Sequence, residues 1–256
     1  MFDTVGFIGS GRIARIMVGG WKKAGAMPAT IFAYDANPAA VAALREDDPG
    51  VKVARLDEAA GADLVFGALH PPALLEVLPA VAGLLKDDAL FCSLAPKVKL
   101  AALTATLGGF SRVARMNPNS PSIIGQGFNP LAFGADLPSA AREALLRVLA
   151  PLGQSPQVDE RWLETYAVIS AMGPTYFGFQ FAEVERLAES FGLTPDAARA
   201  AVRQMLHGTV DLLFASDLPR RQALDLVPVR PLAEQEAEIV GMLQRQIGGM
   251  HAKLTG

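Results

Sequence analysis

Residues 9–14 have the types and spacing of a phosphate-binding turn. They read Gly-Ser-Gly-Arg-Ile-Ala, the Gly-x-Gly-x-x-Ala form of the turn that holds the pyrophosphate of a dinucleotide. Gly9 permits the tight turn, Gly11 lets the backbone approach the phosphates, and Ala14 allows close packing of helix on strand. A helix that begins here directs free N–H groups at the phosphates. We therefore predict cofactor contacts from Gly9, Ser10, Gly11, Arg12, Ile13 and Ala14; the alternative is a glycine-rich turn without a ligand.

Asp35 provides the acid that such a site has after its second strand. It ends the apolar stretch 30–35 and lies 26 residues after Gly9, near the position of the carboxylate that binds the adenosine ribose. A carboxylate there accepts from the 2′-hydroxyl of NAD and repels the 2′-phosphate of NADP. Arg12 is the only nearby cation that the sequence offers to a phosphate. We predict NAD(P)H with a slight preference for NADH; alternatively, Asp35 only caps the turn 36–38.

The carboxyl ends of three further predicted strands carry the stretches 69–71, 93–95 and 117–119. In an open parallel sheet, ligands bind beyond these ends. We therefore predict further cofactor contacts from Ala68, His70, Pro71 and Ala95. His70 is the only histidine at such a position and could donate a proton near neutral pH. The alternative is that His70 only contacts the ribose or phosphate of the cofactor.

A helix breaker, Gly173-Pro174, interrupts an otherwise regular helical pattern over residues 159–191. Apolar residues recur there at spacings of three and four, which indicates one amphipathic helix. Pro174 has no N–H and does not fit a helix interior. Either the helix continues and the Ser170 carbonyl loses its usual donor, or a second helix starts with Pro174 in its first position. A ligand could approach the backbone here, but a purely structural kink is the alternative.

Two hydroxyls follow this interruption, on Thr175 and Tyr176. They could orient a substrate, whereas a packed aromatic ring is the alternative reading of Tyr176. A hydride reductase needs a held nicotinamide, an oriented substrate and a proton donor. Our catalytic candidates are therefore His70, Thr175 and Tyr176.

The elements that must position these residues alternate in the first part of the chain. Short apolar runs predict strands at 4–9, 30–35, 62–69, 88–94 and 111–117. The segments between them predict helices at 12–25, 38–47, 71–85 and 97–107. This alternation is typical of a parallel sheet with helices on both faces. We predict an α/β, doubly wound Rossmann domain over residues 1–155.

From about residue 139 the pattern becomes helical and no strand signal remains. The interrupted helix is followed by one with Thr194 as N-cap and Pro195 in first position. A last helix is predicted to break near Gly248-Gly249. We predict an all-α domain over residues 156–256 that serves for dimerisation and substrate binding.

Composition narrows the function classes. The net charge is −3 without a basic stripe, which argues against a nucleic-acid partner. One cysteine and three histidines argue against a disulfide framework and a Cys/His metal site. We see no signal peptide, and no uncharged apolar run long enough for a membrane span. We therefore expect a cytoplasmic protein without metal or membrane.

Several motifs together resemble the pyrroline-5-carboxylate reductase family, over nearly the whole chain. The stretch GFIGSGRIA matches the N-terminal motif of that family, and ADLVFGALHPP matches a family strand that ends in an Ala-Val-Lys-Pro type sequence. A third resembles its R-x-M-P-N-T-P segment, through Arg115, Pro118, Asn119, Ser120 and Pro121. A fourth resembles its S-G-S-G-P-A-Y segment, through Ser170, Gly173, Pro174 and Tyr176.

The resemblance implies a Rossmann domain followed by a helical domain that interlocks with a partner subunit, so we expect a homodimer or higher oligomer. It also implies reduction of a cyclic imine by a nicotinamide cofactor. The matching positions imply substrate contacts from Asn119, Ser170 and Gly173. 

The chain departs from the family at 225–239. This stretch contains neither the glycines nor the threonines of the family's S-P-G-G-T-T turn. Arg230 lies there, and a guanidinium forms bidentate bonds with a carboxylate. We predict that Arg230 binds an acidic group of the substrate; the alternative is a surface arginine paired with Glu234 or Glu236.

Three functions remain open from the sequence. The first is an NAD(P)H-dependent reductase that acts on a small imine or carbonyl substrate. The second is a genuine pyrroline-5-carboxylate reductase with a remodelled carboxylate site. The third is a nucleotide-binding sensor or regulatory dimer without catalytic activity.

Overall fold

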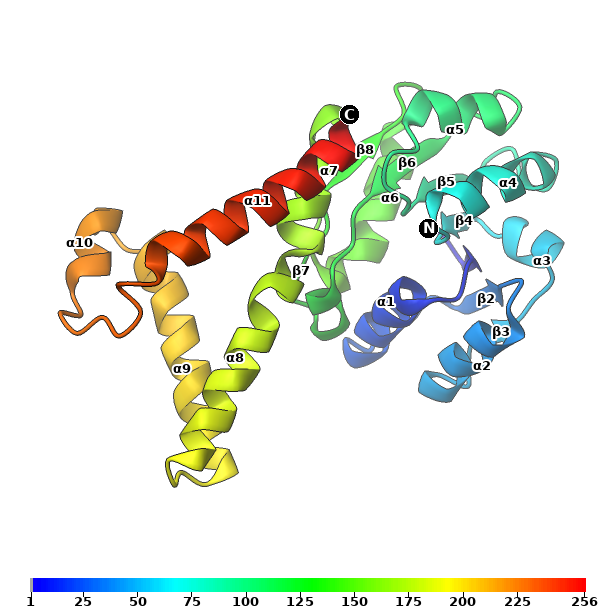
Figure 1. The fold of residues 1–256 in the computed structure, drawn as a ribbon. Helices are drawn as coiled ribbons and strands as arrows, with labels where there is room; N and C mark the ends of the chain where they lie inside the picture. The colour runs from blue at the N-terminus through cyan, green and yellow to red at the C-terminus, as the bar shows by residue number, and fades with distance from the viewer. Residues whose placement is uncertain (1) are drawn as a thin grey trace. The chain divides into compact units, whose positions relative to one another are not determined.

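The computed structural model describes residues 2–256, which form two compact units (Figure 1). The first unit runs to Met172 and includes Met250–Gly256, whereas the second unit is Gly173–Gly249. The predicted functional division after residue 155 stays a prediction, and the compact units divide between Met172 and Gly173.

A seven-stranded sheet in the order β3-β2-β1-β4-β5-β6-β8 forms the centre of the first unit. Its strands are β1 (Thr4–Ile8), β2 (Thr30–Tyr34), β3 (Lys52–Val53), β4 (Leu64–Gly67), β5 (Leu90–Ser93), β6 (Val113–Met116) and β8 (Leu131–Phe133). All neighbours are parallel except β8, which is antiparallel to β6. The α/β fold class is confirmed, with β8 as the one exception to the expected parallel sheet.

Helices cover both faces of this sheet, as the sequence predicted. They are α1 (Arg12–Lys23), α2 (Pro38–Asp47), α3 (Leu56–Ala60), α4 (Pro71–Ala82), α5 (Leu100–Thr106), α6 (Ser139–Leu149) and α7 (Leu163–Tyr166). Successive strand residues point into two separate cores: Phe7 lies in one and Ile8 in the other. The alternation of side chains along a strand therefore places apolar residues on both faces.

The shortest strands and helices were not predicted from the sequence. They include β3, α3, β8 and a second sheet that pairs β7 (Gly127–Phe128) with β9 (Gly153–Gln154). The expectation of no strand beyond residue 139 is therefore wrong. Two- and three-residue strands form through their partners' backbone groups, so they leave no periodic pattern of their own. Three 3₁₀ turns complete the first unit, at Ser120–Ile124, Ala150–Leu152 and Glu160–Trp162.

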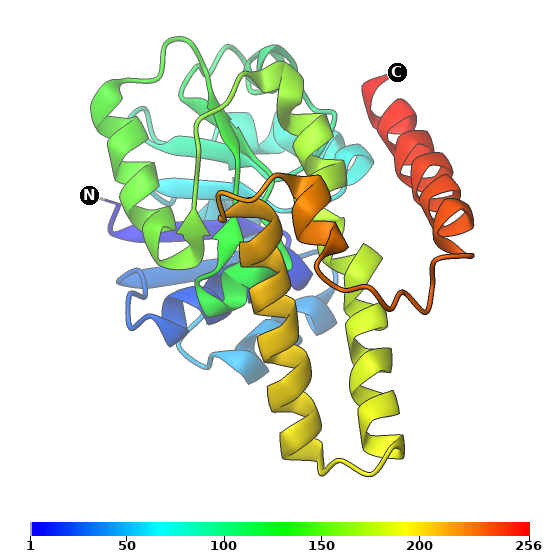
Figure 2. The same cartoon turned by 90° about the vertical axis from the view of Figure 1, so that its left-hand side faces the viewer.

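The second unit contains α8 (Gly173–Ser190), α9 (Pro195–Phe214), α10 (Arg220–Asp225) and most of α11 (Glu236–Thr255). Helices α8 and α9 lie side by side as an antiparallel hairpin (Figure 2). Thr194 caps α9 by accepting from the Ala197 N–H, as predicted. The predicted break at Gly248-Gly249 is wrong, because α11 runs through both glycines. None of the described helices combines the length and apolar character needed to cross a bilayer.

The interruption at Gly173-Pro174 resolves into two helices. Helix α7 widens into a π-helical turn over Ala167–Ala171, Met172 bends, and α8 begins at Gly173. The alternative of a new helix is therefore confirmed, with Pro174 in its second rather than its first position. Proline is tolerated in this first turn because its missing N–H would have no intrahelical partner.

Candidate active site

Gly9 and Gly11, the two glycines of the first turn, differ in backbone conformation and in the space around them. Gly9 has φ +102°, and a Cβ there would lie 2.6 Å from the Ala68 carbonyl oxygen, so the backbone itself requires glycine. Its N–H donates to the Tyr34 carbonyl at 2.8 Å. Gly11 has φ −74°, and a Cβ there would meet no atom within 4 Å. The packing of this chain therefore does not require glycine at 11, which fits a site that a pyrophosphate approaches closely.

The N-terminus of α1 is available to an anion. Gly11 is its N-cap and provides no side-chain hydrogen bond, and the first turn contains no acidic residue. The first N–H groups of a helix have no intrahelical partner. Arg12 is exposed at this end, whereas Ser10 is fully buried. The predicted residues 9–14 therefore form the turn before α1 and the first residues of that helix, and their N–H donors suit phosphate groups.

Asp35 connects this turn to the end of β2. Its Oδ2 accepts from the Ser10 N–H and its Oδ1 from the Asn37 N–H, both at 2.8 Å. The bond to Asn37 is the capping role that the sequence left open. Each carboxylate oxygen has a second lone pair, so the same group retains acceptor capacity for a ribose hydroxyl. The ribose contact stays a prediction.

A cavity of about 470 Å³ adjoins Asp35. Its lining is Tyr34, Asp35, Pro38, Val41, Ala42, Arg45, Val53, Ala54 and Arg55. The expectation that Arg12 is the only nearby cation is therefore wrong, because Arg45 and Arg55 also line this cavity. Arg55 is paired with Asp57 at 2.5 Å, whereas Arg45 has no ion-pair partner among residues 2–256. The sequence analysis missed these cations because Arg45 lies within α2 and Arg55 follows the two-residue strand β3.

The ends of β4 and β5 bring the other predicted cofactor residues to the same edge of the sheet. The Ala68 N–H donates to the Ile8 carbonyl at 2.8 Å, which places Ala68 beside the turn at Gly9. His70 is exposed at the N-cap of α4, directly before Pro71. Ala95 is buried, and its N–H donates to Ser93 Oγ at 3.2 Å. Ala68, His70, Pro71 and Ala95 therefore lie where parallel strands end, as the ligand-binding rule for open sheets expects.

Asn119 supplies the hydrogen bond that the interrupted helix lacks. Its Nδ2 donates to the Ser170 carbonyl at 3.2 Å, the carbonyl that loses its donor because Pro174 has no N–H. Its Oδ1 accepts from the Phe128 N–H at 3.1 Å. Ser170 Oγ donates to the Tyr166 carbonyl at 2.8 Å. Asn119 and Ser170, predicted to contact substrate, are brought together and are also structural.

The first unit contains a buried ion cluster of Arg115, Glu160 and Glu164 that the sequence analysis missed. Arg115 is 1% exposed and donates to Glu160 at 2.8 Å and to Glu164 at 2.7 Å. Burial raises the pKa of Glu164, but hydrogen bonds from Arg115 and Lys99 lower it more, to about 2. The signal was present as two acids four residues apart, although nothing local indicated their partner.

The remaining site candidates lie in the second unit. Gly173 is the first residue of α8, and a Cβ on it would meet no atom within 4 Å. Thr175 is exposed, and partial burial of Tyr176 raises the pKa of its hydroxyl. Arg230 forms an ion pair with Glu236, which is the pairing that the sequence offered as the alternative to substrate binding.

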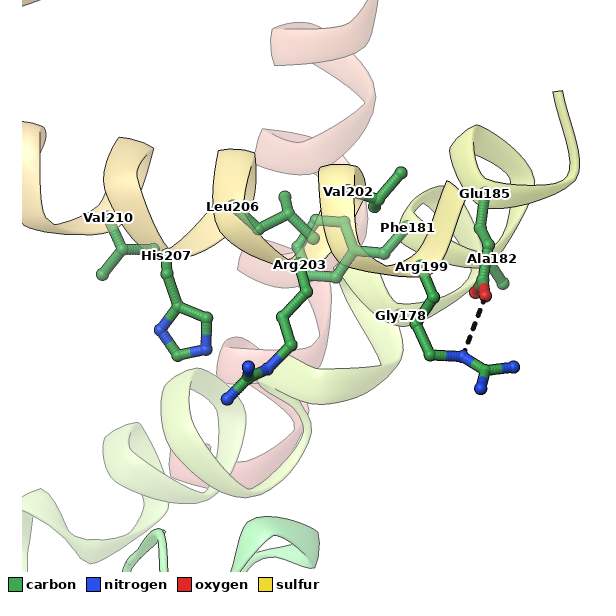
Figure 3. A pocket seen from close by; sticks show the side chains of 10 residues that line it. All are labelled: Gly178, Phe181, Ala182, Glu185, Arg199, Val202, Arg203, Leu206, His207 and Val210. Carbon is green, nitrogen blue, oxygen red and sulfur yellow. Dashed lines mark ion pairs between the residues drawn. The ribbon is translucent and has the colours of Figure 1, made fainter. Parts of the chain in front are cut away.

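The second unit also contains a cavity of about 610 Å³ between α8 and α9. Figure 3 shows Arg199, Arg203 and His207 along one side of α9, with Arg199 paired to Glu185 at 3.4 Å. The floor is apolar and includes Phe181, Val202 and Leu206. None of the predicted substrate residues lines this cavity within the described chain.

Comparison with known proteins agrees with the geometry. The family model described as NADP oxidoreductase, coenzyme F420-dependent, matches residues 4–95. The pyrroline-5-carboxylate reductase of Pseudomonas aeruginosa is 28% identical over 216 residues, 84% of this chain and 79% of that protein. That of Escherichia coli is 28% identical over 200 residues, 77% of this chain and 74% of that protein. Over most of its length, the chain is therefore similar to pyrroline-5-carboxylate reductases.

Solved structures share the fold of this reductase. The Plasmodium falciparum pyrroline carboxylate reductase with NADP bound has a TM-score of 0.85 at 18% identity, over 99% of this chain and 97% of that one. The Coxiella burnetii pyrroline-5-carboxylate reductase has a TM-score of 0.73 at 22% identity, over 99% and 96%. These structures confirm the fold. The family model and the curated relatives confirm the class of enzyme, an NAD(P)-dependent reductase.

Proposed function

We propose that this reductase transfers hydride from NAD(P)H to the C=N or C=O bond of a small substrate that carries an acidic group. Pyrroline-5-carboxylate is the first candidate, because the relatives named above are reductases of that compound. The observation that carries the proposal is the turn at residues 9–14, which Asp35 ties to the neighbouring strand end through the Ser10 N–H. When bound there, the cofactor supplies the hydride, and the chain supplies orientation and a proton.

We assign the proton to His70, which is exposed at the end of β4 where the cofactor residues gather. An imidazole exchanges protons near neutral pH. Thr175 and Tyr176 would orient the substrate, and Asn119, Ser170 and Gly173 would form one wall of its pocket. A His70→Gln enzyme should lose kcat while it still binds NADH; unchanged kcat would assign His70 to cofactor binding alone.

Arg230 is our candidate for the substrate's acidic group. Arg230 lies on the connection between α10 and α11, and its present partner Glu236 is the first residue of α11. Both side chains are exposed, so this ion pair contributes little. The guanidinium can therefore exchange that partner for a carboxylate at small cost. The Arg230→Ala enzyme should raise the substrate KM about tenfold or more, with Arg221→Ala as a surface control. An unchanged KM would reject the role.

We also propose NADH as the slightly preferred cofactor. Asp35 supports it through its remaining acceptor capacity, and Arg55 is already paired with Asp57. Arg45 favours the opposite choice, because it lines the same cavity without an ion-pair partner among the described residues. Fluorescence titration with NADH and NADPH decides the matter: tighter binding of NADPH would overturn this use of Asp35.

We further propose a homodimer or higher oligomer formed by the second unit. The unit exposes large apolar side chains, including Phe179 at 67%, Phe191 at 81% and Phe214 at 72%. Exposed apolar surface of this extent marks an interaction site. Light scattering at micromolar concentration tests the proposal, and a monomer would contradict it.

The substrate test is NADH oxidation with pyrroline-5-carboxylate beside a panel of other cyclic imines, ketones and aldehydes. Turnover of pyrroline-5-carboxylate above the panel would identify a reductase of that compound with a remodelled carboxylate site. Turnover of another compound would identify an altered substrate. The third outcome is a nucleotide-binding protein without catalytic activity, which the absence of glycine and threonine from the stretch 225–239 suggests. Tight nucleotide binding without turnover would identify a sensor.

A further inference from the structure

Lys97 holds an unusual backbone conformation just after β5. It has φ +68°, and it is the only residue other than glycine with positive φ in the described part of the chain. The left-handed region is disfavoured for L-residues because Cβ crowds the following carbonyl oxygen. Residues kept in such conformations concentrate at functional sites, where the surrounding structure holds them in place. The question is therefore what holds Lys97 and which segment depends on it.

The carboxylate of Glu164 holds the backbone of Lys97 in this conformation. The Lys97 N–H donates to Glu164 Oε1 at 3.0 Å. Glu164 is 2% exposed, and the same oxygen accepts from Arg115 Nη2 at 2.7 Å. Its other oxygen accepts from Lys99 Nζ at 2.9 Å. Because Arg115 is itself buried in β6, this carboxylate has a fixed position from which to bind a single backbone N–H.

A neighbouring acid repeats the arrangement one turn away. Glu160 Oε1 accepts from Arg115 Nη1 at 2.8 Å and from the Leu100 N–H at 2.6 Å. Both acids therefore connect β6 to the backbone of 97–100. The Lys97 side chain adds a weaker attachment, because its exposed Nζ donates to the Lys253 carbonyl at 2.8 Å.

The segment that depends on Lys97 carries a predicted cofactor contact. Leu94 donates its N–H to the Gly67 carbonyl at 3.0 Å, so the segment starts at the end of β4 as well as β5. Ala95 follows, two residues before Lys97. Strand β4 lies between β5 and β1, and β1 ends in the turn at Gly9. Residues 94–97 are therefore at the ligand-binding edge of the sheet.

We propose that Glu164 is a positioning residue, which selects the left-handed conformation of Lys97 and thereby sets the backbone of 94–97 for NAD(P)H. Glu164 does not touch the cofactor in this account; it acts through Lys97. The inference rests on the proposed cofactor site and not on the identity of the substrate. If only the left-handed form binds, the apparent Kd rises in inverse proportion to its population.

The test compares two variants at exposed Lys97 that both lose the bond to Lys253. Glycine adopts positive φ readily, whereas a β-branched valine does not. Lys97→Val should therefore raise the Kd for NADH about tenfold, and Lys97→Gly should stay within about twofold of the wild type. Binding is measured by fluorescence titration without substrate. Equal Kd values for the two variants would overturn the proposal.

A second pair of variants tests the role of Glu164 itself. Glu164→Ala should also raise the Kd for NADH about tenfold, and adding Lys97→Gly should restore most of the affinity. Lys97→Gly should not restore the Tm, because Glu164→Ala also removes the buried ion pair between Glu164 and Arg115. Lys99→Ala is the control, because it removes another partner of the same carboxylate. A double variant that binds as weakly as Glu164→Ala would reject the proposal.

The two proposals fail in different ways. Failure of the proposed function appears as absent imine or carbonyl reduction by the wild-type enzyme. Failure of this inference appears as affinities that do not depend on the residue at position 97.

Discussion

The two units of this reductase bury their apolar residues very differently. Strands β4, β5 and β6 are buried along their whole length, and two cores enclose the sheet. Helices α8 and α11 contain no buried residue at all, and α9 contains one, Ala198. The first unit therefore buries its apolar side chains within itself, whereas the second unit is rich in apolar side chains but leaves most of them exposed. This contrast is the physical argument for a partner subunit.

Removing a large side chain from the first unit should have the largest effect. Phe66 is fully buried and stacks on Phe7 with ring centroids 5.3 Å apart. We expect Phe66→Ala to lower the free energy of unfolding by about 3–5 kcal/mol, measured by urea denaturation. The loss should be the same at every protein concentration. A loss that shrinks as concentration rises would break the proposed contrast between the units.

Acid should next weaken the first unit. The pKa of Glu164 is lowered to about 2 in the folded protein, below its unfolded value of about 4.3. Its contribution is therefore fully present above the unfolded pKa and is lost as the pH falls toward 2, by about 3 kcal/mol. Unfolding by urea between pH 6 and 2.5 measures this. A Glu164→Gln variant should show a flatter acid limb, and an unchanged slope would contradict the assignment.

A substitution on the second unit should have a smaller effect that depends on concentration. Phe179 is 67% exposed on α8. Phe179→Ser should weaken self-association about tenfold, or about 1.4 kcal/mol, while Gln180→Ser on the same helix should not. Sedimentation velocity over a dilution series checks both. Equal dissociation constants for the two variants would place the interface elsewhere.

The smallest expected effect concerns the cavity beside Asp35. If NADH is preferred, the exposed Arg45 has no phosphate to bind, and Arg45→Ala should change the Kd for NADH by less than about twofold. The Kd for NADPH should rise by at most about fivefold. Titration with both nucleotides gives the ratio. A much larger loss for NADPH would mean that Arg45, rather than Asp35, sets the cofactor preference.

Features that depend on neighbouring residues could be predicted from the sequence, whereas features that depend on distant contacts could not. The turn at Gly9, the strands around it and the Thr194 cap depend on neighbouring residues, and their positions were predicted to within a few residues. The strand β8 and the continuous helix α11 were missed, because strand pairing and helix length depend on contacts outside the local pattern.

Pro174 shows the difference between what the sequence determined and what the tertiary structure decided. The sequence by itself determined that Pro174 has no N–H to donate, so the Ser170 carbonyl must find another donor. Only the tertiary structure decided that Asn119 supplies it, from 51 residues away. The same holds for Arg115 with Glu164, and for Glu164 with Lys97. A missing hydrogen bond is a local property of the chain, whereas its replacement depends on which strand end the fold places beside it.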